Sequence, residues 1–356
     1  MVSAPTKLPT QPGFIMLSPE EREAGKWSRA NLQRGMELLH RDGLLAMSNI
    51  VDKDHLVALR ESMLETAKEI RADKTKLTDF NHGVATNHLQ SPPLNDPSLL
   101  YEDVFSNNFV HQIVRSYLGP DIQMAFITAN TALPNTKDRQ PVHKDAPWAH
   151  PLAPYMLNTN FPLSDFTPEN GSTEFWLGSH LNTTNEEQLW RTSSSPTPTC
   201  DVTPACIAER LKTRPGEQIR VPFGTVLLRD MRTWHAGMPN STDTERIMIA
   251  VGYSSSWYPS PPQKFKAPLA AKELLTKRTP ADFDWLPDAE WEKISQRWGL
   301  DEKDGIFLPA SPGMAPGSGT GKGWDGTGAE PWDCLNVTAE QDKVVNPNFN
   351  TAAIGA

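Results

Sequence analysis

A histidine and an aspartate stand two residues apart near the middle of the chain, as His143 and Asp145. In an extended strand, residues i and i+2 point to the same face, so both side chains can reach one point in space. An imidazole nitrogen and a carboxylate oxygen are two of the three ligands of the facial triad that holds non-haem Fe(II) and leaves positions open. Such a pair also fits a surface histidine beside a capping aspartate. The assignment as a metal site therefore depends on whether the chain offers a third ligand.

The best candidate for the third ligand is His235, which must come from a distant strand. Eleven positions later Arg246 opens an apolar run that ends at Tyr253. Arginine presents a planar fork of donors that matches a carboxylate bidentately. A His-x-Asp pair, a later histidine and an arginine about one strand further on are what iron and a dicarboxylate co-substrate would require. The alternative for Arg246 is an ordinary surface charge.

With these residues the chain resembles the phytanoyl-CoA dioxygenase family of Fe(II)/2-oxoglutarate-dependent oxygenases, and within it the fungal members that tailor natural products. The resemblance covers roughly residues 30–258 and also rests on two short motifs, Glu169-Asn170-Gly171-Ser172-Thr173 and Gly178-Ser179-His180. It implies His143, Asp145 and His235 as iron ligands, with 2-oxoglutarate and O2 as co-substrates. Halogenating members have a small residue in place of the aspartate, so Asp145 favours hydroxylation, desaturation or oxidative rearrangement.

The same resemblance implies Arg246 as the partner of the far carboxylate of 2-oxoglutarate, and Gln140 and Thr173 as further hydrogen-bond donors. Gln140 could equally be a turn residue, and Thr173 a strand residue that packs outward. For an apolar substrate pocket the candidates are aromatic residues close to the motifs: Trp148, Tyr155, Trp234 and Trp257. Each of these aromatic residues could instead belong to the core.

From residue 123 onward the pattern predicts short strands between Pro, Gly and Asn turns, at residues 123–133, 155–163, 173–177, 218–222, 225–228 and 246–253. Such a series predicts a mainly β fold with flanking helices: a double-stranded β-helix, or jelly-roll (cupin-like) barrel. No helical pattern alternates with the strands, which argues against a Rossmann-type sheet.

We expect one catalytic domain over residues 1–356. Residues 17–118 would form a helical support, with one helix from Ser18 through Leu39, a strand at 44–47, a helix after Asp52 and another at 111–117. Residues 1–16 would be a flexible or loosely docked arm, and residues 74–110 are loop-rich. The jelly-roll core would span 120–258, with a polar insert at 181–216 that holds a short helix at 204–212. Residues 259–356, with helices at 268–277 and 288–298, would pack on the core or on a partner subunit.

The composition of the chain limits the classes of binding partner that we expect. A net charge of −9 and a pI near 5.5 argue against nucleic acid. No apolar segment approaches the length of a membrane helix, and the first residues show no secretory signal. Three cysteines without metal spacing indicate a reduced, cytoplasmic compartment. The expected partner is therefore a small, largely apolar molecule from secondary-metabolite biosynthesis, and the resemblance also makes a homodimer the expected assembly.

Two other functions stay open. The protein could be a metal-binding jelly roll that binds or isomerises a ligand without turnover of 2-oxoglutarate. It could also be a scaffold whose insert and tail recruit partners. Release of succinate from 2-oxoglutarate distinguishes the oxygenase from both.

Overall fold

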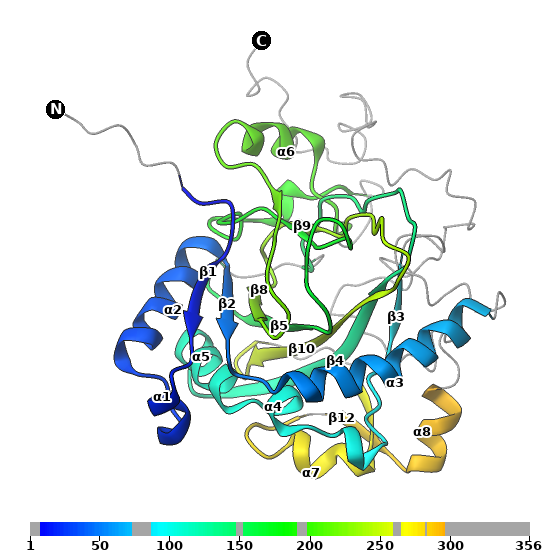
Figure 1. The fold of residues 1–356 in the computed structure, drawn as a ribbon. Coiled ribbons are helices and arrows are strands. Elements are labelled where there is room, and N and C mark those ends of the chain that lie inside the picture. Colours follow the sequence, from blue (N-terminus) through cyan, green and yellow to red (C-terminus); the bar gives the residue numbers. More distant parts are fainter. Residues whose placement is uncertain are drawn as a thin grey trace.

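The computed structural model describes residues 8–72, 87–146, 152–190, 198–258, 265–281 and 283–295. Its framework is a seven-stranded sheet, antiparallel except for its first pair (Figure 1). Across the sheet the order is β1 (Gly13–Met16), β2 (Leu44–Ser48), β8 (Val226–Asp230), β5 (Met156–Pro162), β10 (Arg246–Ser255), β4 (Ile122–Ala132) and β3 (Asn87–Gln90).

A second, three-stranded sheet faces the first. It consists of β7 (Glu217–Gln218), β6 (Glu174–Phe175) and β9 (His235–Ala236), in that order. The contact between the two sheets is apolar: Leu44, Ala46 and Leu227 of the large sheet pack with Phe175 and Ile219. Two facing, mainly antiparallel sheets around a common core are the arrangement of a double-stranded β-helix. The predicted jelly-roll fold is therefore confirmed.

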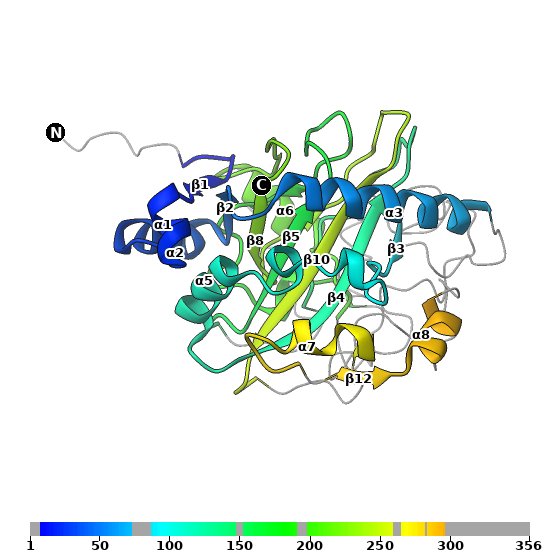
Figure 2. The same cartoon turned by 60° about the horizontal axis from the view of Figure 1, so that its bottom comes forward.

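The other face of the large sheet is covered by helices α2 (Arg29–Asp42), α3 (Lys53–Ala72) and α5 (Asn108–Leu118), which lie in front of it in Figure 2. Successive side chains of a strand point to opposite faces, so each strand contributes to the apolar layers on both sides of the sheet. On β2, Leu45 and Met47 join the core beneath the helices, whereas their neighbours face the small sheet. Burying one such side chain contributes about 1.5–3 kcal/mol, so both faces of the sheet stabilise the fold.

The predicted helix start at Ser18 is confirmed, but the single helix through Leu39 is wrong. Ser18 caps α1 (Pro19–Ala24): its hydroxyl accepts from the Glu21 N–H at 3.2 Å, and the Glu21 carboxylate accepts from the Ser18 N–H at 3.0 Å. Gly25 then ends the helix in the left-handed conformation, with φ of 62°. A second cap at Ser28 begins α2.

Two strands of the large sheet were not predicted, and neither were the paired strands of the C-terminal extension that are named below. The end of the expected arm forms β1, which adds an edge to the large sheet beside β2, and the loop-rich stretch contributes β3 at the opposite edge. The remaining described elements are α4 (Glu102–Phe105), α6 (Pro204–Leu211), α7 (Lys272–Leu275), α8 (Asp288–Ser295), β11 (Phe265–Pro268), β12 (Phe283–Leu286) and 3-10 turns at Pro97–Leu99, Asn185–Glu187 and Leu269–Ala271. Short helices were expected where α6, α7 and α8 lie.

The described part of the C-terminal extension contacts the large sheet. The Met124 N–H of β4 donates to the Pro280 carbonyl at 2.8 Å, and Met124 also forms a bridge with Ala281. Residues 296–356 lie outside the described residues, so the expected tail contacts beyond that point stay a prediction. Among the described helices, none combines the length and the apolar character that crossing a bilayer requires.

Gly43 is a point where the helical layer meets the strand that leads to His235. It caps α2 with φ of 70°, and a Cβ there would lie 2.3 Å from Thr233 Oγ1 and 2.6 Å from His180 Nδ1. Gly25 has the same left-handed conformation but open space around it, with Asn108 Nδ2 the nearest atom at 4.0 Å.

We predict that Gly25→Ala lowers the free energy of unfolding by about 1 kcal/mol, the cost of a left-handed alanine. Gly43→Ala should lower it by roughly 2–4 kcal/mol, because overpacking adds to that cost. Urea unfolding of both variants beside the wild type measures the difference. Equal losses for the two variants would show that the contact at Gly43 relaxes without cost.

Candidate metal centre

Two segments far apart in the sequence are joined by a reciprocal pair of backbone hydrogen bonds. The His143 N–H donates to the His235 carbonyl at 2.9 Å, and the His235 N–H donates to the His143 carbonyl at 2.8 Å. Residues paired in this way in an antiparallel ladder carry their side chains on the same face. The two imidazole rings accordingly lie 4.2 Å apart, centroid to centroid.

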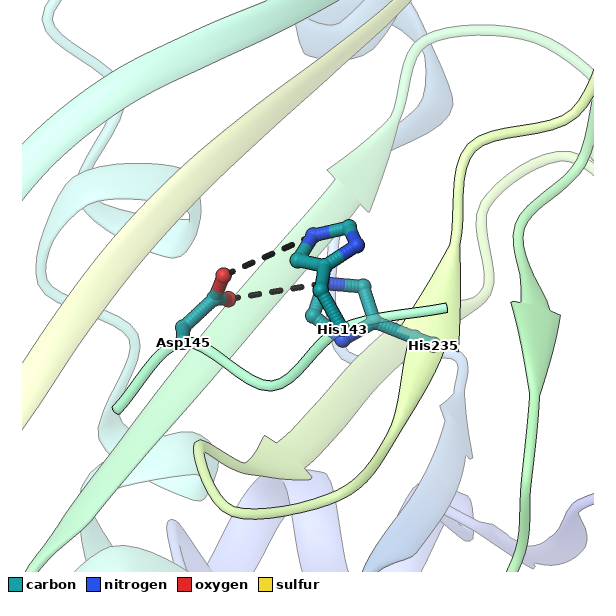
Figure 3. Close-up of side chains that lie close together, drawn as sticks. All are labelled: His143, Asp145 and His235. Atoms are coloured by element: carbon teal, nitrogen blue, oxygen red, sulfur yellow. Dashed lines mark ion pairs between the residues drawn. The ribbon is translucent and has the colours of Figure 1, made fainter. Parts of the chain in front are cut away.

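Asp145 completes the cluster from the same segment as His143 (Figure 3). One carboxylate oxygen, Oδ1, lies 3.7 Å from His143 Nε2, and the other, Oδ2, lies 3.5 Å from His235 Nε2. One ligand atom from each residue falls within 4.8 Å of the others. The structure thus brings together the three side chains predicted as iron ligands, and the donor set is that of the facial triad.

Backbone carbonyls orient both imidazoles. His143 Nδ1 lies 2.8 Å from the Pro141 carbonyl, and His235 Nδ1 lies 3.1 Å from the Thr233 carbonyl. A proton on each Nδ1 donates to its carbonyl and leaves Nε2 as a lone-pair donor toward the centre. Burial lowers the pKa of both imidazoles, that of His235 well below its ordinary value, so both are neutral as metal ligation requires. The sequence alone did not identify these partners.

A buried arginine, Arg229 of β8, pairs with the third ligand. Its Nη2 donates to Asp145 Oδ2 at 2.6 Å, and its side chain is 4% exposed. Burial opposes ionisation of Asp145, but the positive charge of Arg229 and the hydrogen bond that it donates hold the pKa of the carboxyl well below its usual range. Sequence reasoning missed Arg229. Its place in the sequence could have identified it: Arg229 follows Leu227 by two residues and so lies on the same, inward face of the strand.

The residue between the two ligands, Lys144, points the other way and is fully buried. Its Nζ lies 2.8 Å from Thr183 Oγ1, 2.5 Å from the Thr184 carbonyl and 3.1 Å from the Glu187 carboxylate. A buried charge is tolerated when it is paired and hydrogen-bonded in this way. The polar insert therefore anchors the strand that carries His143 and Asp145.

Arg246 lies at the start of β10 with its side chain directed between the two sheets. The residue is 3% exposed; Nη2 donates to the Gly171 carbonyl at 2.7 Å, and the guanidinium lies 5.0 Å from the Phe166 ring centroid. Nε and Nη1 are buried and have no hydrogen-bond partner among the described residues. Burial lowers the pKa of Arg246 to about 10, so it stays charged at neutral pH. A buried cation with unused donors fits a carboxylate group.

The two short motifs of the sequence have structural roles near these groups. Gly171 supplies the carbonyl that Arg246 contacts, and its φ of 74° and the Met238 carbonyl, 2.6 Å from where a Cβ would lie, exclude a side chain. The Ser179 hydroxyl accepts from the Trp234 N–H at 2.8 Å and so fixes the strand that carries His235. Both motifs support the site without belonging to the triad.

Gln140 and Thr173 lie close to the ligand strands. Gln140 Oε1 accepts from the Gly237 N–H at 2.8 Å, which extends the pairing between the two ligand segments. Its Nε2 has no partner in the part of the chain that the structure describes, so it could serve a ligand. Thr173 is buried immediately before β6, and its carbonyl accepts from the Ile219 N–H. Their predicted roles toward 2-oxoglutarate stay predictions.

The aromatic substrate candidates fall in different places. Trp234 packs with Trp176 in a core on the face of the strand opposite to His235, rather than at the triad. Tyr155 is fully buried and its ring lies 4.2 Å from that of Tyr258. Trp257 is 56% exposed. Trp148 lies outside the described residues.

Polar side chains that the sequence did not single out also line the space between the sheets. By register, Asn158 of β5 stands beside Arg229, and Thr128 of β4 stands beside Ala250 of β10, on the face that carries Arg246. Asn158 Oδ1 and Thr128 Oγ1 are buried without a hydrogen-bond partner among the described residues. Buried groups of this kind need a partner, such as a water molecule or a polar ligand.

Comparison with known proteins agrees with this geometry. The family described as phytanoyl-CoA dioxygenase (PhyH) matches residues 39–248. The dioxygenase andF of Emericella variicolor is 23% identical over 238 residues, which cover 63% of this chain and 73% of that protein.

Two crystal structures are similar at lower identity. AviO1 from Streptomyces viridochromogenes shares 18% identity with a TM-score of 0.49, over 66% of this chain and 100% of that one. The epimerase SnoN, solved with Fe3+, alpha ketoglutarate and nogalamycin RO, shares 18% identity with a TM-score of 0.47, over 64% and 85% of the two chains.

The family match spans more than half of the chain and includes every residue of the His143, Asp145 and His235 cluster. Two neutral imidazoles, one ionised carboxylate and a buried arginine with free donors are the groups that Fe(II) and 2-oxoglutarate need. The chain therefore belongs to the phytanoyl-CoA dioxygenase family and is a non-haem Fe(II)/2-oxoglutarate-dependent oxygenase.

Proposed function

We propose that the protein oxidises a C–H bond of a small organic molecule, by hydroxylation, desaturation or oxidative rearrangement, in the biosynthesis of a secondary metabolite. The observation that carries the proposal is the pairing of two features in one interior space. The His–Asp–His cluster lies between Arg229 of the large sheet and Phe175 of the small one, and Arg246 presents unused donors on the inner face of the same large sheet.

Fe(II), when bound, activates O2 with electrons from 2-oxoglutarate, which leaves as succinate and CO2 while the substrate is oxidised. The chain's own residues bind and orient. His143 and His235 offer Nε2, and Asp145 supplies the negative charge that a cation needs. Arg246 holds the far carboxylate of 2-oxoglutarate, and Gln140 and Thr173 would add donors to it.

The substrate end of the site is proposed at the Tyr155–Tyr258 pair, close in sequence to Asp145 and beside Ala146. Trp257, exposed next to Tyr258, would contact the outer part of an apolar substrate. The named relatives support a role in natural-product tailoring: one is a fungal dioxygenase, and another was solved with nogalamycin RO. Asn158 and Thr128 add polar contacts, so the bound molecules need not be wholly apolar. Homodimer formation and a cytoplasmic location stay expectations drawn from the sequence.

The alternative function is a metal-binding jelly roll that binds or isomerises a ligand without turnover of 2-oxoglutarate. The unused donors of Arg246 favour the oxygenase, because a protein without a carboxylate ligand gains nothing from a buried, half-satisfied guanidinium. Fe(II)-dependent formation of succinate from 2-oxoglutarate distinguishes the two functions.

We predict that His143→Ala and His235→Ala each weaken Mn(II) binding more than about 100-fold, because loss of even a partner of a metal ligand costs 10–100-fold. Anaerobic titration calorimetry measures the affinity, and succinate formation should fall to background. His40→Ala, on the exposed side of α2, serves as the control and should bind Mn(II) as the wild type does. Unchanged binding in either triad variant would place the metal elsewhere.

We predict that Arg246→Ala raises the KM for 2-oxoglutarate by roughly 30-fold or more, the usual cost of deleting one partner of a buried charge pair. Mn(II) affinity should stay within about twofold, because Arg246 contacts no ligand of the triad. The matched control is Arg220→Ala, which removes an exposed arginine paired with Glu169. An unchanged KM in Arg246→Ala would show that another group binds the co-substrate.

A further inference from the structure

We propose that Arg229 is a positioning residue that restricts Asp145 to a single metal-ligating oxygen and so keeps coordination positions open for the co-substrate. This inference rests on the proposed iron and 2-oxoglutarate site. It adds a determinant of that site that no motif in the sequence marks.

The contact is built to hold one oxygen. The bond of 2.6 Å from Arg229 Nη2 joins two ionised groups at Asp145 Oδ2, which lies 3.5 Å from His235 Nε2. It leaves Oδ1, 3.7 Å from His143 Nε2, without that bond and available to a metal. Charge-assisted bonds are roughly twice as strong as neutral ones. Rotating the carboxylate so that both oxygens reach a metal would break this bond inside the protein, where the guanidinium would be left buried and unpaired.

Arg229 is itself held in place. It lies in the middle of the large sheet, where its backbone is in register with Leu44 on one side and Asn158 on the other. Its Nη1 is 3.4 Å from His235 Nδ1, but the proton on Nδ1 of His235 is directed to the Thr233 carbonyl. Arg229 therefore acts on the centre through Asp145 rather than through the imidazole.

Coordination number explains why this matters. A facial triad supplies three ligand atoms and leaves the remaining positions of the metal open. A keto acid that chelates through its carboxylate and keto oxygens needs two of them, and O2 needs another. Carboxylates also bind metals through both oxygens. An Asp145 that did so would occupy one of the open positions and compete with 2-oxoglutarate or O2.

The experiment compares Co(II) and 2-oxoglutarate binding in the full chain, without O2 and without turnover. Arg229→Met removes the charge and keeps most of the unbranched stem, and Arg229→Lys keeps the charge without the planar fork. Arg232→Lys is the matched control, because Arg232 is an equally buried arginine paired with Asp230, which is not a triad residue. Calorimetry gives both affinities, and the visible Co(II) absorption reports a change in the ligands of the metal.

We expect Arg229→Met to bind Co(II) no more than about 10-fold more weakly than the wild type, the low end of the 10–100-fold cost of losing a ligand's partner, because the second oxygen of Asp145 then reaches the metal. 2-Oxoglutarate should bind at least about 10-fold more weakly, because the charged hydrogen bond that kept this oxygen off the metal is lost. The Co(II) band of the binary complex should change in position or intensity, because a carboxylate oxygen takes a position that solvent fills in the wild type. The affinity of Arg229→Lys for 2-oxoglutarate should fall between those of the wild type and Arg229→Met. This variant tests the proposal if the methionine variant fails to fold. Arg232→Lys should match the wild type.

Wild-type affinity for 2-oxoglutarate and an unchanged Co(II) band in both Arg229 variants would overturn the positioning role while leaving the oxygenase assignment intact. A wild-type protein that binds Co(II) but not 2-oxoglutarate would instead overturn the proposed function, and this inference with it.

Discussion

The site depends on the two backbone hydrogen bonds that His143 and His235 exchange. They join a segment after β4 to the short strand β9 and set the register of both. A slip of one residue would turn one imidazole to the opposite face and destroy the cluster. The hydrogen bond between Gln140 and Gly237 continues the pairing on one side of His235. On the other side, the Ser179 hydroxyl accepts from the Trp234 N–H. The surrounding sheets thus act mainly to preserve one register.

Two of the buried arginines, Arg229 and Arg246, lie between the sheets and differ in their partners. Arg229 has an anionic partner in Asp145, whereas Arg246 has only a carbonyl and an aromatic face among the described residues. Burying an unpaired guanidinium is costly, so the second arginine indicates that an anion joins it in the working protein. The fold maintains this unsatisfied group between two apolar layers that supply the stability.

The sequence was most informative where chemistry constrains spacing. His143 and Asp145 share one short segment, and the apolar run headed by Arg246 marks an interior strand, so the ligand set and the jelly roll could be predicted. The strand β3 could not, because its place at a sheet edge depends on β4 rather than on its own residues. Arg229 was also missed, because its pairing with Asp145 exists only once the sheet has formed.

The most direct test is a crystal structure of the protein grown without O2 in the presence of Mn(II) and 2-oxoglutarate. We predict one metal ion bound by Nε2 of His143, Nε2 of His235 and a single oxygen of Asp145, with the far carboxylate of 2-oxoglutarate on Arg246. A metal ion bound away from these three side chains, or a co-substrate whose far carboxylate does not meet Arg246, would contradict this prediction.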